Sequence, residues 1–142
     1  MALINPYLNF NGNTEEVFDF YKSVFGGEYA MVMRFKEAPA EHQMGMTDGN
    51  QIMHISLPIG HGTILMGSDV PEMYGKVIQG TDIQISISAD SKTEADKLFT
   101  GLSAGGQVTM PMSDTFWGSY FGMFKDKFGI GWMISFDAKY AG

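Results

Sequence analysis

The chain has no cysteine among its 142 residues. A disulfide framework, a thiolate zinc site and a cysteine nucleophile are therefore excluded. The sequence also lacks any stretch near the roughly 20 consecutive apolar residues that a membrane-spanning helix needs, and its N-terminus has no basic region followed by an apolar run. We therefore expect a cytoplasmic protein that does not act at a membrane.

Basic residues are scarce, with 9 Lys and Arg against 16 Asp and Glu, which gives a formal net charge of −7. A nucleic-acid backbone would be repelled unless those few cations gathered on one face, so no nucleic-acid partner is expected. Hydrophobic residues make up 44% of the chain and charged residues 18%. This composition is typical of a globular protein, and the length suits a single domain over residues 1–142.

The first half of the chain alternates strand and helix signals in a definite order. A helix is predicted after Asn11-Gly12-Asn13, with Thr14 as its N-cap, acids in its first turn and Gly26-Gly27 at its end. Alternating apolar residues predict strands on either side of this helix. These strands are expected at 4–10, 28–35, 51–57 and 63–66, with a long loop at 36–50.

The second half repeats this order of elements. Ile83, Ile85 and Ile87 alternate with polar residues in a clear half-buried strand, and a helix opens near Asp90 and closes at Gly105-Gly106. The strands of this half are expected at 82–87, 107–110, 119–124 and 130–136. We therefore predict two βαβββ modules, at 4–68 and 80–138. One helix covers only one face of each sheet, so the other face needs a partner or a ligand.

Several stretches, in order and over most of the chain, carry a family resemblance. They are 6–12, 18–27, 53–57, 64–69 and 117–134, the last including Trp117-Gly118-Ser119-Tyr120-Phe121-Gly122 and Phe128-Gly129-Ile130-Gly131-Trp132. With them the chain resembles the vicinal-oxygen-chelate superfamily of glyoxalases, bleomycin-resistance proteins and dioxygenases, and most closely its PhnB-like branch. The resemblance implies an α+β fold in which two βαβββ modules form a cupped mixed sheet with the helices outside.

The resemblance also implies where a metal would be held. Metal-dependent members take ligands, typically His and Glu, from the first and last strands of each module. Those places fall on Tyr7 and Asp82 in the first strands and on Met66 and Met133 in the last strands. Zn²⁺, Mn²⁺ and Fe²⁺ sites need about three N or O ligands, and only Asp82 is a suitable one. We therefore expect no inherited metal site and no cofactor.

The remaining pocket candidates follow from strand alternation and from an aromatic cluster. Asn9 and Gln84 share faces with Tyr7 and Asp82, and His54 lies opposite the face of Ile55 and Leu57. A half-buried histidine bonded to a neighbour is the commoner explanation of His54, although a role as pocket donor or general base stays open.

The aromatic cluster comprises Phe116, Trp117, Tyr120 and Phe121. Core packing is its ordinary explanation, and its position before a strand, with glycines interleaved, also fits a pocket rim of Trp117 and Tyr120. Arg34, beside the long loop, is the best candidate to hold an anionic group.

Three hypotheses about function follow. The leading one is a metal-independent protein that binds a small apolar or cationic organic molecule, as the bleomycin-resistance members do. The alternative is a metal-dependent glyoxalase-like lyase or dioxygenase with relocated ligands, drawn from His54, Asp82 and either Glu28 or Asp69. A third is a degenerate module that serves only as an interaction partner.

Under every reading we expect a homodimer, because superfamily members commonly assemble their sheets across subunits. The label 3-demethylubiquinone-9 3-methyltransferase, often given to the PhnB-like branch, has no support here. The glycines of Asn11-Gly12-Asn13 and of the two Gly-Gly pairs belong to turns and helix ends, rather than to the strand–glycine turn–helix of a doubly wound nucleotide-binding fold.

Overall fold

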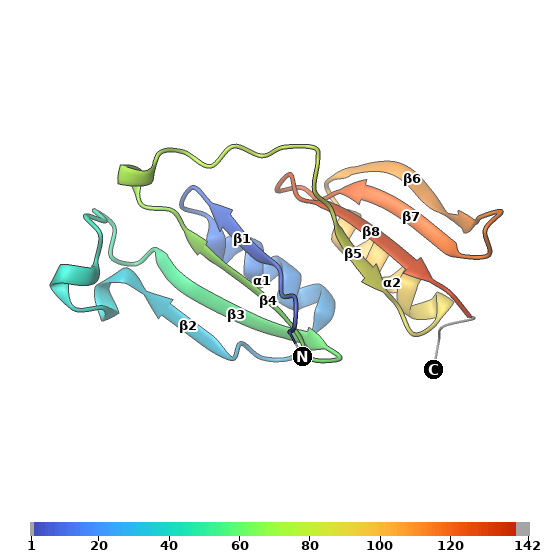
Figure 1. Ribbon diagram of the computed structural model, residues 1–142, viewed down its shortest axis with the longest axis horizontal. Helices are drawn as coiled ribbons and strands as arrows, with labels where there is room; N and C mark the ends of the chain where they lie inside the picture. Colours follow the sequence, from blue (N-terminus) through green and yellow to red (C-terminus); the bar gives the residue numbers. More distant parts are fainter. Residues whose placement is uncertain (1, 139–142) are drawn as a thin grey trace. The chain divides into compact units, whose positions relative to one another are not determined.

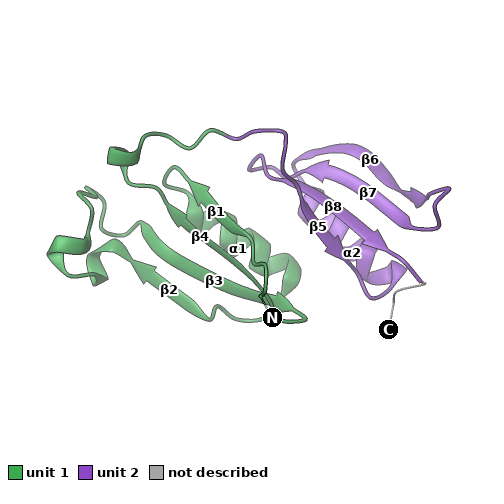
Figure 2. Ribbon diagram, viewed as in Figure 1, with its two compact units in different colours: residues 1–78 green, residues 79–142 purple. Residues whose placement is uncertain are grey.

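The computed structural model describes residues 2–138. By its internal contacts the chain divides into two compact units, residues 1–78 and 79–142 (Figure 2). Each unit holds one four-stranded mixed sheet and one long helix, in the order strand, helix and three strands. The predicted α+β class with two βαβββ modules is therefore confirmed. Within residues 2–138, no helix is long and apolar enough to cross a membrane.

The first unit is built on the sheet order β1-β4-β3-β2 (Figure 1). Its elements are β1 (Tyr7–Phe10), α1 (Thr14–Phe25), β2 (Met31–Arg34), β3 (Ile52–Gly60) and β4 (Thr63–Asp69). Strand β1 runs parallel to β4, and the other two pairs are antiparallel. Short 3₁₀ turns at Phe35–Glu37, Ala40–His42 and Glu72–Tyr74 lie in the connections.

The second unit has the equivalent sheet order, β5-β8-β7-β6. Its elements are β5 (Ile85–Ser88), α2 (Lys92–Ser103), β6 (Gln107–Asp114), β7 (Tyr120–Lys125) and β8 (Gly131–Phe136). Strand β5 runs parallel to β8, which makes it the counterpart of β1. The internal repeat read from the sequence is thus a repeat of topology.

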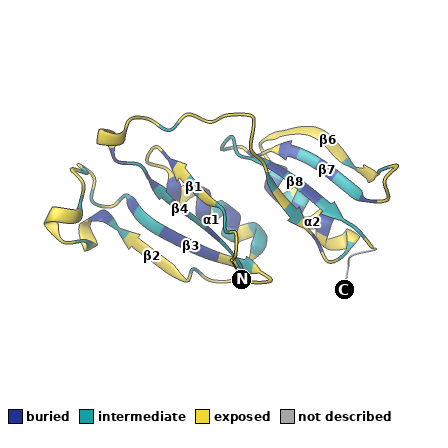
Figure 3. Ribbon diagram, viewed as in Figure 1, coloured by how far each residue is buried: buried dark blue, intermediate teal, exposed yellow. Residues whose placement is uncertain are grey.

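Each helix buries an apolar stripe against one face of its own sheet. In the first unit Phe18 and Tyr21 of α1 are fully buried, as are Ile55, Leu57 and Leu65 of the sheet. In the second unit α2 buries Ala95, Leu98 and Leu102, and its sheet buries Phe124, Trp132 and Ile134. Figure 3 shows the buried segments concentrated in β3, β4 and β8, whereas the edge strands β2 and β6 are largely exposed. The face of each sheet away from its own helix is left for other contacts.

Three strands begin later than their apolar alternation suggests. We expected strands from Ile4, Glu28 and Asp82, but β1 begins at Tyr7, β2 at Met31 and β5 at Ile85. The neighbour of β5 explains the last difference, because β8 itself begins at Gly131 and pairs with β5 only from Ile85 opposite Trp132. Asp82 therefore lies before the strand and is exposed.

The N-terminus of α1 is capped from a distance. We expected Thr14 to be the N-cap, but the N-cap is Asn13, whose side chain makes no capping hydrogen bond, and Thr14 is the first helical residue. The carboxylate of Asp69, at the end of β4, performs this role. Its Oδ1 accepts hydrogen bonds from the backbone N–H of Gly12 at 3.0 Å, the backbone N–H of Thr14 at 3.1 Å and the Thr14 hydroxyl at 2.6 Å.

Candidate functional site

The face of the first sheet opposite α1 carries the main group of candidate residues. Cross-strand pairing arranges eight side chains on this face in two adjacent rows. One row consists of Tyr7, Met66, Ser56 and Met31, and the other of Asn9, Ser68, His54 and Met33. We call these eight residues the first open face. The sequence prediction included Tyr7, Asn9, His54 and Met66, and the structure brings these four onto one surface.

A tyrosine–histidine contact spans the first open face. The hydroxyl oxygen of Tyr7 lies 3.4 Å from Nδ1 of His54, and the centroids of the two rings are 5.7 Å apart. Strand β4 lies between their strands, so the phenol reaches across Met66 and Ser68 to meet the imidazole. The contact restrains the orientation of the imidazole and directs its Nε2 away from Tyr7.

Three methionine side chains share the face with this contact. Met31 and Met33 project from the edge strand β2 and are 47% and 36% exposed. Ser56 is only 7% exposed although it lies on the same face, between Met66 and Met31 in its row. Thioether side chains are long and adaptable, and they can fit ligands of irregular shape. The first open face is therefore accessible and mixed in character, with three methionines and the Tyr7 ring beside four polar side chains.

Sequence analysis did not assign Met31, Met33 or Ser68 to this surface. The alternation within β2 indicated two faces but did not indicate which face packs against α1. That choice depends on the register between β2 and β3, which places Met33 directly opposite His54.

The second sheet has a similar face opposite α2, which we call the second open face. One row consists of Ser86, Met133, Met123 and Met110, and the next of Ser88, Ser135, Phe121 and Ser113. Predicted residues Met133 and Gln84 belong here, since Gln84 lies against Gly131 beside this row. Trp117, in the β6–β7 hairpin, is 56% exposed and packs edge-on against Phe121 with ring centroids 6.0 Å apart.

Tyr120 and Asp82, two further predicted residues, lie apart from these rows. The Tyr120 hydroxyl donates a 2.5 Å hydrogen bond to Asp96 of α2, and Lys92 of α2 lies over its ring. Tyr120 thus faces the helix side, and the bond to the Asp96 carboxylate raises the pKa of its phenol. We expected Asp82 to lie on the first strand of this unit, near Met133, but the β5 residue opposite Met133 is Ser86. Ser86 therefore corresponds to Tyr7 of the first unit, and Met133 corresponds to Met66.

The residues at the superfamily's metal positions do not fit a divalent ion. They are a phenol, two thioethers and a serine, and thioethers favour soft ions over Zn²⁺, Mn²⁺ or Fe²⁺. Within residues 2–138, no group of three or more His, Asp and Glu side chains is arranged to hold a metal. The Asp69 carboxylate is buried and bonded to backbone N–H groups, and Glu28 pairs with Lys22 at 3.5 Å.

An acidic cleft of about 520 Å³ lies along the N-terminal part of α1. Its charged lining residues are Glu15, Glu16, Asp19, Asp48 and Asp69. Arg34, expected to hold an anion, instead forms a bidentate pair with Glu15, at 3.0 and 2.6 Å, and donates to the carbonyl of Asn50. These bonds hold the pKa of the Glu15 carboxyl below its ordinary value.

Tyr29, just before β2, has a shifted pKa. Burial and a 2.6 Å hydrogen bond to Asp19 raise the pKa of Tyr29.

A second cleft, of about 480 Å³, lies between Met46 and Thr47 of the long loop and Glu72 and Lys76 of the segment after β4. Asn11 lines this cleft, and its side chain bonds both backbone groups of Val77.

Known proteins match the chain over nearly its whole length. It is 29% identical over 140 residues to protein YjdN of Escherichia coli, an alignment that covers 93% of each chain. Among solved structures, protein PA1353 of Pseudomonas aeruginosa is 39% identical with a TM-score of 0.83, covering 96% of this chain and 98% of that one. A Bacillus cereus PhnB protein, described as a putative 3-demethylubiquinone-9 3-methyltransferase, shares the fold at 23% identity and a TM-score of 0.73, covering 95% and 99%.

A family model provides the assignment. The model of the Glyoxalase/Bleomycin resistance protein/Dioxygenase superfamily matches residues 3–134, a span that includes the first open face and all of the second open face except Ser135, near the end of β8. The chain therefore belongs to the Glyoxalase/Bleomycin resistance protein/Dioxygenase superfamily.

Proposed function

We propose that the protein binds a small organic molecule, apolar or cationic, on the first open face and without a divalent metal. Membership of the superfamily supports small-molecule binding of this general type. The observation that carries the finer proposal is the Tyr7–His54 contact, on a sheet face that the unit's own helix does not cover. Met31, Met33 and Met66 lie on the same face.

The chemistry of the first open face favours a flat ligand with one polar group. The phenol ring of Tyr7 offers a π face to an aromatic or cationic group. The His54 imidazole can donate or accept one hydrogen bond, and the methionines supply adaptable apolar contact. No side chain of the two rows is a carboxylate or an ammonium, so a cationic group would be held by the Tyr7 ring rather than by an ion pair, and an anionic group has no Lys or Arg partner here.

The test is a thermal-shift titration of chelator-treated protein with two probes, benzyltrimethylammonium and 1-naphthol. A compound that binds only the folded state stabilises that state and so raises the unfolding midpoint. At a hundredfold excess over Kd the free energy of unfolding rises by about 2.7 kcal/mol. We expect at least one probe to give a saturable shift, and His54→Gln to weaken its apparent affinity about tenfold. His42→Gln, an exposed substitution in the same unit, is the matched control and should leave the shift unchanged.

Two results would count against the proposal. One is that neither probe shifts the midpoint of the chelator-treated protein, whereas a shift appears once Zn²⁺ or Mn²⁺ is restored. The other is that His54→Gln and His42→Gln behave alike, which would place binding elsewhere on the molecule.

A further inference from the structure

Three neighbouring strands of the second sheet each contribute one methionine to the same row. Met110 of β6 lies opposite Met123 of β7, and Met123 lies opposite Met133 of β8. We call these three residues the methionine row. Directly opposite residues of antiparallel strands have Cβ atoms about 4.5–5.5 Å apart. A flexible thioether on each side of Met123 can therefore lean toward it, so that three sulfur atoms reach one point above the sheet.

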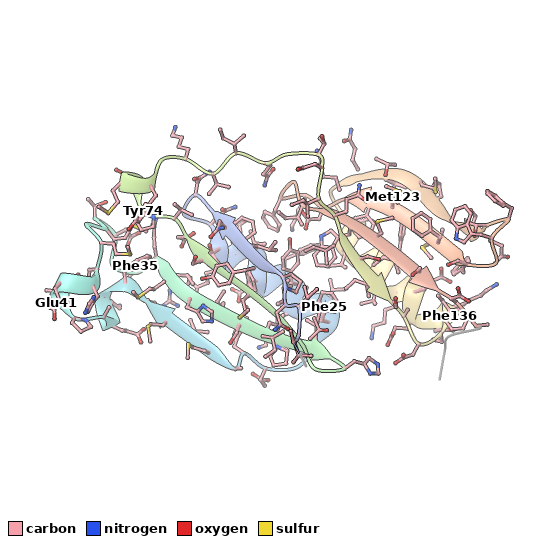
Figure 4. All side chains as sticks on the ribbon, in the orientation of Figure 1. Phe25, Phe35, Glu41, Tyr74, Met123 and Phe136 are labelled. Carbon is pink, nitrogen blue, oxygen red and sulfur yellow. The ribbon has the colours of Figure 1, made fainter. Side chains whose placement is uncertain are left out.

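The methionine row is not part of the hydrophobic core. Core residues of this sheet, such as Phe124, Trp132 and Ile134, alternate with the row and face α2. Met110 is 41% exposed, and Met123 and Met133 are half-buried. Figure 4 labels Met123, which lies on β7, one of the two inner strands of this sheet. The neighbouring row on this face holds three serines and Phe121, so the three thioethers are the only sulfur donors of the two rows.

Ligand chemistry identifies the ion that such a group would take. Thioether sulfur is a neutral, soft donor that selects Cu(I) over Zn²⁺, Mg²⁺ or Mn²⁺, which prefer imidazole and oxygen. Three neutral donors suit a monovalent cation, and the net charge of −7 adds a favourable general field. Lys125, two residues beyond Met123, is an opposing charge on this face, but it is exposed and its ammonium can extend into water.

We propose that Met110, Met123 and Met133 form a binding site for one soft monovalent metal ion, Cu(I) or its analogue Ag(I). The site uses none of the residues of the first open face, so it is independent of the organic-ligand proposal. It also differs in chemistry from the divalent-metal positions of the superfamily, because all of its donors are neutral sulfur atoms.

The experiment is a calorimetric titration of the full-length protein with Cu(I), under anaerobic conditions with ascorbate and without a competing chelator. We expect one Cu(I) to bind per chain. Met123→Leu removes the central sulfur at nearly constant volume and should weaken the affinity at least tenfold. Met112→Leu is the matched control, because Met112 lies in the same hairpin but contacts Gly122 on the helix side; its affinity should equal that of wild type.

The pH dependence separates this site from one built on histidine. Thioethers do not titrate, so the Cu(I) affinity should be the same at pH 5.5 and pH 7.5, whereas imidazole ligands become protonated over this range. The proposal is overturned if no Cu(I) binds or if folded Met123→Leu binds like wild type. A loss of binding in His54→Gln, or a tenfold drop at the lower pH, would also overturn it by placing the ion on the first sheet.

Discussion

At the scale of single residues, one buried carboxylate in each unit organises its local backbone. Asp69 is 2% exposed, and its two oxygens accept hydrogen bonds from Gly12, Thr14 and Ile52. In the second unit Asp126 accepts from the backbone N–H groups of Phe128 and Ile130 and from the indole Nε1 of Trp132. A buried carboxylate is tolerated when its lone pairs are satisfied in this way.

Asp69→Asn should destabilise the protein by about 2–4 kcal/mol. The asparagine amide group would face N–H donors where an oxygen now accepts, and the negative charge at the N-terminus of α1 would be lost. The measurement is urea unfolding at pH 7. Asp82→Asn, which changes an exposed aspartate before β5, is the control and should shift the free energy of unfolding by less than about 0.5 kcal/mol. Equal effects would show that Asp69 does not organise the turn.

At the scale of secondary-structure elements, glycines in central strands let each helix approach its sheet. A Cβ atom added to Gly67 of β4 would lie 2.8 Å from the Phe18 ring of α1 and 2.7 Å from the carbonyl oxygen of Leu8. Gly122 of β7 has the corresponding place in the second unit, where an added Cβ would lie 2.8 Å from the Phe99 ring of α2. Both glycines are therefore required by close packing.

Gly67→Ala should cost about 1–3 kcal/mol, because α1 would have to move away from β4. Thermal or urea unfolding measures this loss. Gly80→Ala, where the nearest atom to an added Cβ is the end of the flexible Asp82 side chain, provides the comparison and should be nearly neutral. If both variants unfold at the same denaturant concentration, the tight contact between α1 and β4 is not a feature of the protein in solution.

At the scale of the whole molecule, a single chain leaves large apolar side chains in contact with water. Ile4, Ile78, Ile83 and Phe116 are each at least 79% exposed. Scattered exposed apolar residues are normal on monomers, but four such large side chains are apolar surface that a second copy would remove from water.

We predict a homodimer in solution. Light scattering coupled to size-exclusion chromatography should give twice the chain mass of 15.7 kDa. We expect the second copy to cover Phe116, which is exposed in the β6–β7 hairpin of a single chain. Phe116→Ser should therefore shift the population toward monomer, because it removes this apolar contact. A mass of one chain at micromolar concentration would contradict the prediction.

The sequence by itself determined the order of elements and the family. These features follow from local sequence patterns, which do not depend on tertiary contacts. The patterns are the helical spacing of apolar residues in the two helices, the alternation around Ile85 and Ile87, and the ordered stretches from Pro6 to Ile134. Alternation also indicated that His54 lies on the face opposite Ile55 and Leu57, which the burial of those two residues confirms.

Tertiary structure alone decided which residues share a surface. Pairing register placed Met33 beside His54, brought the Tyr7 phenol across β4 and aligned the methionine row, and a slip of one residue would move each of these side chains to the other face. The Asp69 cap was equally invisible in the sequence, because its partners lie up to 57 residues away. Local sequence patterns specify the type of each helix or strand and roughly where it begins and ends, whereas contacts between residues distant in the sequence depend on the register in which the strands pair.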